Sequence, residues 1–258
     1  MSVPGASTRR ASASRQRAKA AIRVAQRIVH DIDRRRLAAG SILPPEHKMV
    51  ARYRVARGTL REALRFLELH GVIHLKPGPG GGPVIGDPDP HHLAGNLALL
   101  LQFVGTPFRA IIEARYVIEP ALAALAAARA TPAALAEIRR CLTTMRAALA
   151  DSVRFHEENR RFHDLLAIAS GNPVFAFLVP ALHAISDSSG LVYDPPVRRR
   201  ALRGNTEIYR AIARRDAAAA QATTERFLGG ALAYLERAHP VAMTRQVTWA
   251  DVSPRPPA

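Results

Sequence analysis

Three arginines, Arg57, Arg61 and Arg65, recur at every fourth position of one segment. At about 100° per residue they form a stripe along one side of a helix, centred about 110° from an apolar stripe on the same helix. The apolar stripe consists of Leu60, Ala63, Leu64 and Leu67. The planar guanidinium of arginine can contact guanine O6 and N7 or clamp a phosphate. The outward stripe therefore indicates DNA recognition, with a solvated charged face as the alternative.

The segments around the arginine stripe predict the rest of a DNA-binding unit. Apolar residues spaced by three and four predict a helix over 20–37, and a second helix is expected over 45–53. With the third helix, over 57–69, this makes a helix-turn-helix. Residues 72–75 and 84–85 are expected to form a hairpin, whose Gly/Pro-rich connection matches no phosphate-binding motif. A hairpin after the recognition helix is the wing of a winged helix.

The charge of the chain is unevenly distributed. The 258 residues include 37 Lys and Arg against 21 Asp and Glu, a formal net charge of +16. Residues 1–86 hold 17 basic and 5 acidic residues, and residues 87–258 hold 20 and 16. Biased codon usage would act on both segments alike, so the asymmetry predicts a polyanion-binding head on a nearly neutral body.

The turn-forming segment from Gly86 to Pro90 marks the boundary between head and body. We expect a disordered basic tail over 1–18, the winged helix over 19–86, a linker over 87–92, a helical domain over 93–238 and a Pro-rich flexible tail over 239–258.

Three ordered motifs of the head resemble a known family. They are Gly40-Ser-Ile-Leu-Pro-Pro-Glu46, Arg57-Gly-Thr-Leu-Arg-Glu-Ala-Leu64 and Leu69-His-Gly-Val-Ile73, followed by the glycine-rich wing. The head resembles the winged-helix domain of GntR-family bacterial transcription regulators. This resemblance implies DNA contacts by Arg57, Thr59, Arg61 and the wing-tip Gly78, and by His47, which stands where Arg is common. The candidate DNA-binding residues are His47, Arg57, Thr59, Arg61, Arg65, Lys76 and Gly78.

Family members usually carry Ser or Thr where this chain has Ala56. The departure removes a helix N-cap worth roughly 0.5–2 kcal/mol and a potential phosphate contact.

The body, residues 91–238, contains only helical patterns, and we expect a bundle of six or seven helices. Its motifs are Glu113-Ala-Arg-Tyr-Val-Ile-Glu119, then Phe162-His163 through Ser170-Gly171-Asn172-Pro173, then Ala211-Ile212 with Asp216. They resemble the FCD effector-binding domain of the FadR subfamily. The resemblance implies a domain that binds a small-molecule effector and dimerises.

Many FCD domains hold a divalent metal with one Asp and three His. In this chain those positions correspond to Asn159, His163, Asn205 and Phe227. Asparagine is a poor ligand for zinc-like ions and phenylalanine is none. We therefore expect no metal or other cofactor, but a polar effector pocket that Phe227 partly fills. A residual site stays open as an alternative, because His156, Asn159 and His163 share one helical face.

Arg115 is a further candidate effector-binding residue, because its guanidinium suits an acidic effector such as a carboxylate. A structural ion pair with Glu113 or Glu119 is the alternative interpretation.

The predicted function is a sequence-specific transcriptional regulator, a repressor, controlled by a small metabolite. We expect it to bind double-stranded operator DNA as a homodimer. The alternative is an architectural or non-specific DNA-binding protein without an effector, which the Arg-rich tail favours. An enzyme is not expected, because no G-x-S-x-G elbow is present and Cys141 lies in a helical pattern. The single cysteine, and the lack of a long apolar run or a secretory h-region, favour a cytoplasmic, nucleoid-associated protein without membrane partners.

Overall fold

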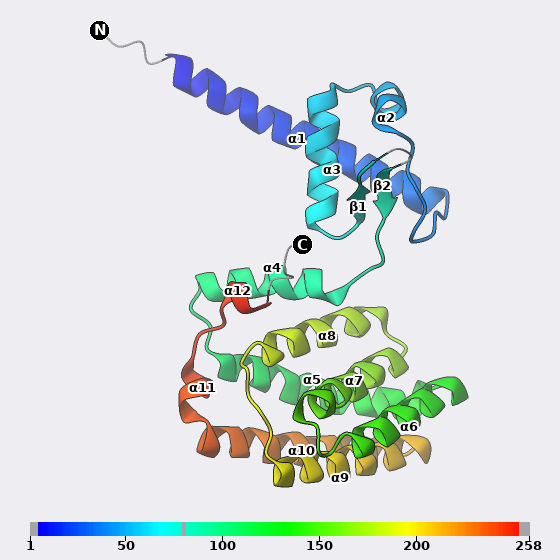
Figure 1. Ribbon diagram of the computed structural model, residues 1–258, viewed down its shortest axis with the longest axis vertical. Helices are drawn as coiled ribbons and strands as arrows, with labels where there is room; N and C mark the ends of the chain where they lie inside the picture. The colour runs from blue at the N-terminus through cyan, green and yellow to red at the C-terminus, as the bar shows by residue number, and fades with distance from the viewer. Residues whose placement is uncertain (1–4, 79–80, 253–258) are drawn as a thin grey trace. The chain divides into compact units, whose positions relative to one another are not determined.

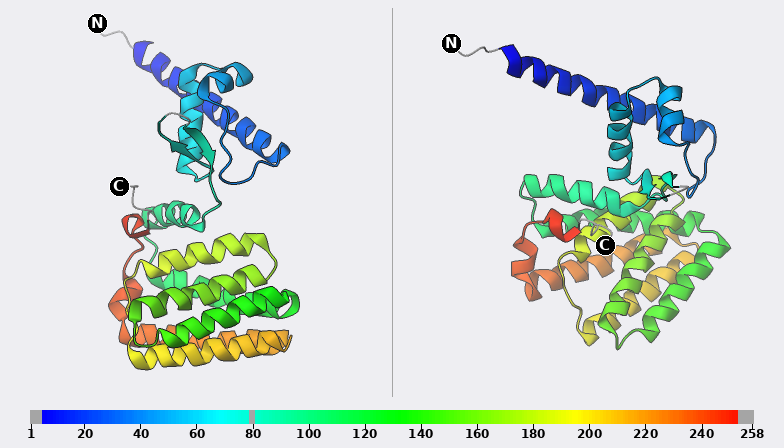
Figure 2. Two further views of the ribbon diagram at one scale, coloured as in Figure 1. Left: turned by 45° about the vertical axis from the view of Figure 1, so that its right-hand side comes forward. Right: turned by 45° about the horizontal axis from the view of Figure 1, so that its top comes forward.

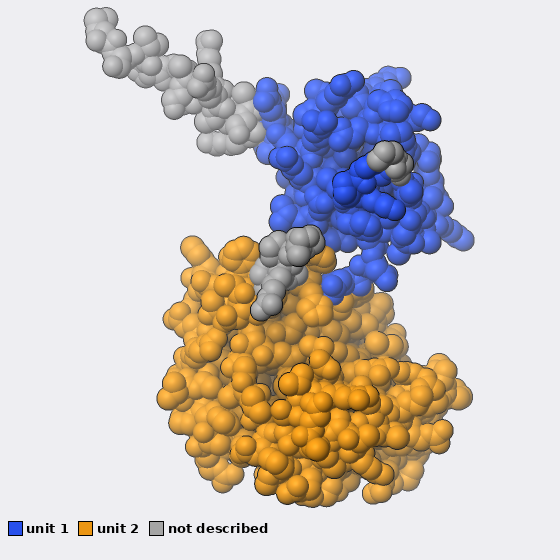
Figure 3. Space-filling model, in the orientation of Figure 1, with its two compact units in different colours: residues 1–89 blue, residues 90–258 orange. Residues whose placement is uncertain are grey.

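The computed structural model describes residues 5–78 and 81–252, and describes side chains from residue 16 onward. The chain forms two compact units, Met1–Asp89 and Pro90–Ala258 (Figure 3). The wing-tip residues Pro79 and Gly80 and the outer parts of both expected tails lie outside the described residues. No helix in the described part of the chain is long and apolar enough to span a membrane.

The described residues of the first unit form three helices and one hairpin (Figure 1). Their bounds are α1 Gly5–Arg34, α2 Glu46–Tyr53, α3 Arg57–Leu69, β1 Ile73–Lys76 and β2 Gly82–Ile85. The strands are antiparallel, with Ile73 opposite Ile85, and Ile42 adds a single bridge to Val84. The expected winged helix is confirmed.

The core of the first unit lies where α1 and α3 pack together beside the hairpin. The apolar stripe of α3 is fully buried there, against Val24, Ala25 and Ile28 of α1. One prediction is wrong: α1 begins at Gly5, inside the segment 1–18 that we expected as a disordered tail. This segment is rich in Ala and Arg, which favour helix, so it can extend the amphipathic helix that begins near Ala20.

The described part of the second unit is entirely helical. The bounds are α4 Pro90–Phe103, α5 Phe108–Arg129, α6 Pro132–Ala147, α7 Ser152–Ala169, α8 Pro173–Asp187, α9 Pro195–Ala213, α10 Ala217–Ala238, α11 Pro240–Thr244 and α12 Trp249–Val252. In both views of Figure 2 the long helices of this unit run side by side as a bundle. The expected helical bundle is confirmed.

Side-chain caps explain where several helices of the bundle begin. A side-chain oxygen accepts a hydrogen bond from a first-turn N–H in four cases: Thr131, Asp151, Asn172 and Asp216. Each cap satisfies a backbone donor that has no partner within its helix. The start of α9 differs, because Asp194 makes no such bond.

The flexible tail expected over 239–258 is also wrong for its described part. Residues 240–252 contain α11 and α12, and Met243, Val247 and Val252 are buried. Val247 and Val252 join the apolar cluster between α4 and α8, and the backbone N–H of Trp249 donates to the side chain of Gln102. Pro240, one of the prolines that suggested a loose tail, instead begins the short helix α11, where its missing N–H is tolerated.

Candidate functional site

The outward face of α3 carries the arginine stripe. Arg57, Arg61 and Arg65 are all exposed, and Thr59 is half-buried beside them. Ala56 stands at the N-cap position without a side-chain hydrogen bond, as expected from its missing hydroxyl. The helix thus presents three guanidinium groups on a rigid apolar base, which is the arrangement that major-groove contact requires.

Arg61 has a partner that the sequence did not indicate. Its Nε donates to Glu46 on α2, with 3.0 Å between Nε and Oε2. The Arg61 side chain remains 66% exposed, so solvent screens the ion pair and its contribution to stability is small. A DNA phosphate or base can therefore displace Glu46 at little cost.

The other candidate DNA contacts lie on α2 and on the hairpin. His47 is exposed on α2, and Lys76 and Gly78 are exposed at the described edge of the wing. A Cβ on Gly81 would lie 2.2 Å from the carbonyl oxygen of Lys76, so only glycine fits this tight tip.

Two side-chain hydrogen bonds that sequence reasoning missed fix α2 to α1. Asp31 on α1 accepts hydrogen bonds from the hydroxyl of Tyr53 (2.8 Å) and from Nε of Arg52 (3.0 Å). Burial, together with the Asp31 carboxylate, raises the pKa of Tyr53 to about 12, so the hydroxyl stays protonated as a donor. This contact sets the position of α2, and with it His47 and Glu46.

The second unit contains a cavity of about 330 Å³ between α5, α7, α9 and α10. Four of the five predicted effector residues line it: Arg115, Asn159, His163 and Phe227. Asn205 does not line the cavity but is fully buried behind Asn159. Its Nδ2 donates to Oδ1 of Asn159 at 3.0 Å. The structure therefore brings all five residues to one place, although they span more than 110 positions of the chain.

The donor set at the four family metal positions does not fit a divalent cation. The Asn159 oxygen already accepts from Asn205, and the ring of Phe227 stacks on that of His163 with 6.2 Å between centroids. No group of three or more His, Cys, Asp or Glu in the described part of the chain is arranged to hold a metal. A Cβ on Gly204 would lie 2.3 Å from the Phe227 ring, so this glycine makes the room that Phe227 occupies.

The residual site that the sequence left open is not formed either. His156 turns to Asp187, with 2.7 Å between Nε2 and Oδ1, and Arg160 donates to the other oxygen of the same carboxylate. This cluster lines a separate cavity of about 40 Å³ next to Arg115 and Asn159. His156 therefore contacts Asp187 and His163 contacts Glu119, although the two histidines share a helical face.

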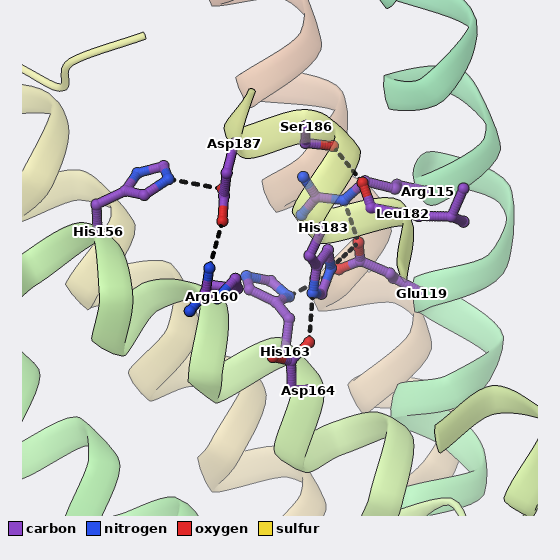
Figure 4. Close-up of polar contacts among 10 residues, drawn as sticks. All are labelled: Arg115, Glu119, His156, Arg160, His163, Asp164, Leu182, His183, Ser186 and Asp187. Carbon is purple, nitrogen blue, oxygen red and sulfur yellow. Dashed lines mark hydrogen bonds and ion pairs between the residues drawn. The ribbon is translucent and has the colours of Figure 1, made fainter. Parts of the chain in front are cut away.

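Glu119 lies at the centre of a buried polar network (Figure 4). Its Oε1 accepts from Nε of Arg115 at 2.7 Å and lies 3.1 Å from Nε2 of His183. Its Oε2 lies 2.7 Å from Nδ1 of His163. Nδ1 of His183 in turn lies 2.6 Å from the carboxylate of Asp164. We call these five residues the Glu119 network.

The protonation states in the Glu119 network follow from burial and charge. Burial alone would raise the pKa of Glu119, but the Arg115 guanidinium and the two histidines outweigh it and hold this pKa well below its usual range. Burial lowers the pKa of His163, so this ring is neutral at pH 7. The pKa of His183 is raised, because Asp164 and Glu119 outweigh the opposing effects of burial and Arg115.

The network shows which carboxylate forms the ion pair with Arg115. The guanidinium forms the ion pair with Glu119 and not with Glu113, which pairs with Arg109. Only Nε is used, however, and the residue still lines the cavity. Arg115 therefore combines a structural role with a surface that faces the cavity.

Sequence reasoning missed several residues of the Glu119 network and of the cavity wall. They are His183 and Asp164 in the network, and Tyr193, Arg200, Arg203 and Arg226 on the cavity wall. A histidine that follows ten apolar residues of α8 was the one available signal for the network. The arginines had none, because 34 arginines occur throughout the chain.

Comparisons with known proteins agree with both units. The model of bacterial regulatory proteins of the gntR family matches residues 20–81, and the FCD domain model matches residues 110–230. An uncharacterised HTH-type transcriptional regulator of Bacillus subtilis, YcbG, is 32% identical over 200 residues, covering 75% of this chain and 80% of its own.

Two repressors are among the other relatives. The HTH-type transcriptional repressor NanR of Cronobacter sakazakii is 30% identical over 158 residues, 58% of each chain. The galactonate operon transcriptional repressor of Escherichia coli is 29% identical, covering 64% of this chain and 71% of its own. Among solved structures, a GntR protein of Streptococcus agalactiae matches with a TM-score of 0.64 and 25% identity, over 83% of this chain and 99% of its own.

Proposed function

Because the chain belongs to the GntR family of bacterial transcription regulators, with an N-terminal helix-turn-helix domain and a C-terminal FCD domain, we propose that it is an operator-binding repressor. It is a regulator and not an enzyme. The observation that carries the proposal is the exposed arginine stripe on α3, joined in one chain to a donor-lined cavity. Repressors among its relatives favour repression over activation. Its partner, chromosomal operator DNA, implies action in the cytoplasm.

The effector in this proposal is a small acid bound without a metal. A cavity of about 330 Å³ is within the range of small-molecule sites. Arg115, Asn159 and Tyr193 line it together with His163. Arg115, Asn159 and Tyr193 can each donate a hydrogen bond to a carboxylate, and we call these three the inner donor group. The neutral ring of His163 directs its one N–H to Glu119 and offers the cavity an acceptor nitrogen. The name of the galactonate operon repressor is consistent with a sugar acid as the type of ligand. Acid binding would shift the affinity for the operator, and by linkage the operator would shift the affinity for the acid equally.

Replacing Arg57 or Arg61 with alanine should lower the affinity for the operator by about 5- to 150-fold each, since a base contact is worth roughly 1–3 kcal/mol. The operator is first selected from random DNA by the full-length protein, and binding is measured by fluorescence anisotropy at fixed salt. Arg139→Ala, which removes an equally exposed charge from α6, is the control and should leave affinity unchanged.

Two results would contradict this assignment. Unchanged binding by both α3 variants would remove α3 as the recognition helix. Failure to enrich any sequence, with uniform coating of DNA, would favour the architectural alternative.

The proposed homodimer needs an interface, and α4 offers one. Residues 90–108 contain no Asp, Glu, Lys or Arg, although charged residues make up 22% of the chain. Leu100, Phe103 and Val104 are exposed there, and Phe103 is 91% exposed. An uncharged helix with large exposed apolar side chains is typical of an interface core.

The double variant Leu100→Glu/Phe103→Glu should therefore be monomeric, because two buried carboxylates cannot be solvated in an apolar interface. Light scattering after size-exclusion chromatography measures the mass. Val117→Glu, at an exposed valine of α5, is the control and should stay dimeric. A dimeric double variant would exclude α4 as the interface.

A further inference from the structure

The outer part of the cavity in the second unit is rich in arginine. Arg200 and Arg203 on α9 and Arg226 on α10 line it, and all three residues are exposed. We call them the rim arginines. Glu207 is the one acidic residue among the described residues that line the cavity. The mouth therefore carries an excess of positive charge, although the body as a whole is nearly neutral.

Helical spacing and close packing bring the rim arginines together. Val197, Arg200, Gly204 and Glu207 recur at spacings of three and four on α9, so they share one face. Gly204 lets α10 approach closely, because a Cβ there would collide with the ring of Phe227. Arg226 directly precedes Phe227 and is thereby placed at the same mouth as the two arginines of α9.

The rim arginines have no carboxylate partner among the described residues. The guanidinium of Arg200 lies 5.3 Å from the centre of the Tyr234 ring, and Arg226 donates to the hydroxyl of Thr223. These contacts orient the side chains but leave their charges uncompensated. By contrast, Arg109, Arg140 and Arg161 of the same unit each pair with a glutamate.

The cavity thus has cation and donor groups at two depths. The inner donor group includes Arg115, whose side chain is only 18% exposed, whereas the rim arginines are solvent-exposed. Apolar side chains such as Ile112, Val197 and Ala201 line the same cavity. A ligand that uses both the inner donor group and the rim arginines carries two anionic groups joined by a neutral part.

We infer that the effector carries a second anionic group, a carboxylate or a phosphate, held by Arg200, Arg203 and Arg226. This inference rests on the proposed function, in which the inner donor group binds the first acid. Arginine suits this role, because its planar fork binds carboxylate and phosphate oxygens in pairs with charge-assisted hydrogen bonds. Because the rim is exposed, we expect a gain of about tenfold in affinity rather than the larger gain of a buried pair.

Matched pairs of acids test the inference on the full-length protein. Gluconate is compared with 6-phosphogluconate, and hexanoate with adipate, by isothermal titration calorimetry at constant ionic strength. In at least one pair, the acid with two anionic groups should bind about tenfold more tightly than the acid with one. The double variant Arg200→Gln/Arg226→Gln should lose this preference while keeping the affinity for the monoanion.

Arg199→Gln is the matched control, because Arg199 is exposed on α9 but does not line the cavity. It should leave both affinities unchanged. Equal binding within both pairs, or a preference that survives in the double variant, would overturn the rim assignment and leave the proposed function standing. Absence of binding by all four acids would instead overturn the acid-binding inner donor group of the proposed function.

Discussion

Replacing Glu119 with alanine is expected to lower the free energy of unfolding by about 3–5 kcal/mol. The carboxylate is 3% exposed and contacts Arg115, His163 and His183 at once. Removing it leaves the Arg115 guanidinium in the interior without its ion-pair partner, and leaves His183 with Asp164 alone. An uncompensated buried charge is far more destabilising than the loss of an exposed ion pair, so the whole bundle should unfold more readily.

Chemical denaturation followed by circular dichroism measures this loss. Glu113→Ala is the control, because Glu113 stands on the same helix in an ion pair with Arg109 that is about half exposed. That variant should lose less than about 1 kcal/mol. Equal losses in the two variants would show that the Glu119 network does not stabilise the fold.

The contribution of Glu119 to the free energy of unfolding depends on pH. Because the folded-state pKa of Glu119 is depressed, its stabilisation is fully present above its unfolded pKa, near 4.5, and is lost as the pH falls through the folded value. The part of the difference between the wild type and Glu119→Gln that comes from the titration of this carboxylate should therefore shrink below about pH 4.5, as measured by chemical denaturation at a series of pH values.

Restoring the family ligand set is expected to create a zinc site at these four positions. The triple variant Asn159→Asp/Asn205→His/Phe227→His supplies a carboxylate and two imidazoles beside His163. The structure supports this prediction because all four positions meet on α7, α9 and α10, through the Asn205–Asn159 hydrogen bond and the His163–Phe227 ring contact. One Asp and three His are sufficient for tetrahedral zinc.

Metal analysis of the purified proteins measures the gain directly. The triple variant should contain one zinc ion, and free zinc at 100 times its dissociation constant should stabilise it by about 2.7 kcal/mol. Adding His163→Ala to the triple variant should abolish both effects, and Asn159→Asp alone should show neither. Stoichiometric zinc or nickel in the wild type, lost on His163→Ala, would contradict the metal-free pocket.

Local rules were sufficient for most of the fold. The burial of the α3 stripe and the starts of α6, α7 and α10 follow from helical periodicity and capping chemistry that lie within a few residues of each other. The segments 1–18 and 239–258, which we expected as tails, were predicted less well. Composition alone does not show whether a segment packs against an apolar surface of the fold. Val247 and Val252 are ordered by α4 and α8, which lie far away in the sequence.

The candidate cavity, like the fold, was predicted from the sequence only in part. Motif spacing was sufficient to select Asn159, His163, Asn205 and Phe227, because the resemblance assigned them to four related positions. It could not show that Asn205 lies behind Asn159, nor that Glu119 would join His163 to His183 on α8.

By itself the sequence determined the family, the winged helix, the helical body and the loss of three metal ligands, since these depend on residue types at short or fixed spacings. Only the tertiary structure decided that Arg115 pairs with Glu119 and that Arg200, Arg203 and Arg226 meet at one mouth. Arg115 lies within one turn of both Glu113 and Glu119 on α5, so helical spacing allows either ion pair and burial selects Glu119. The rim arginines come from two helices, α9 and α10, whose packing no local pattern encodes.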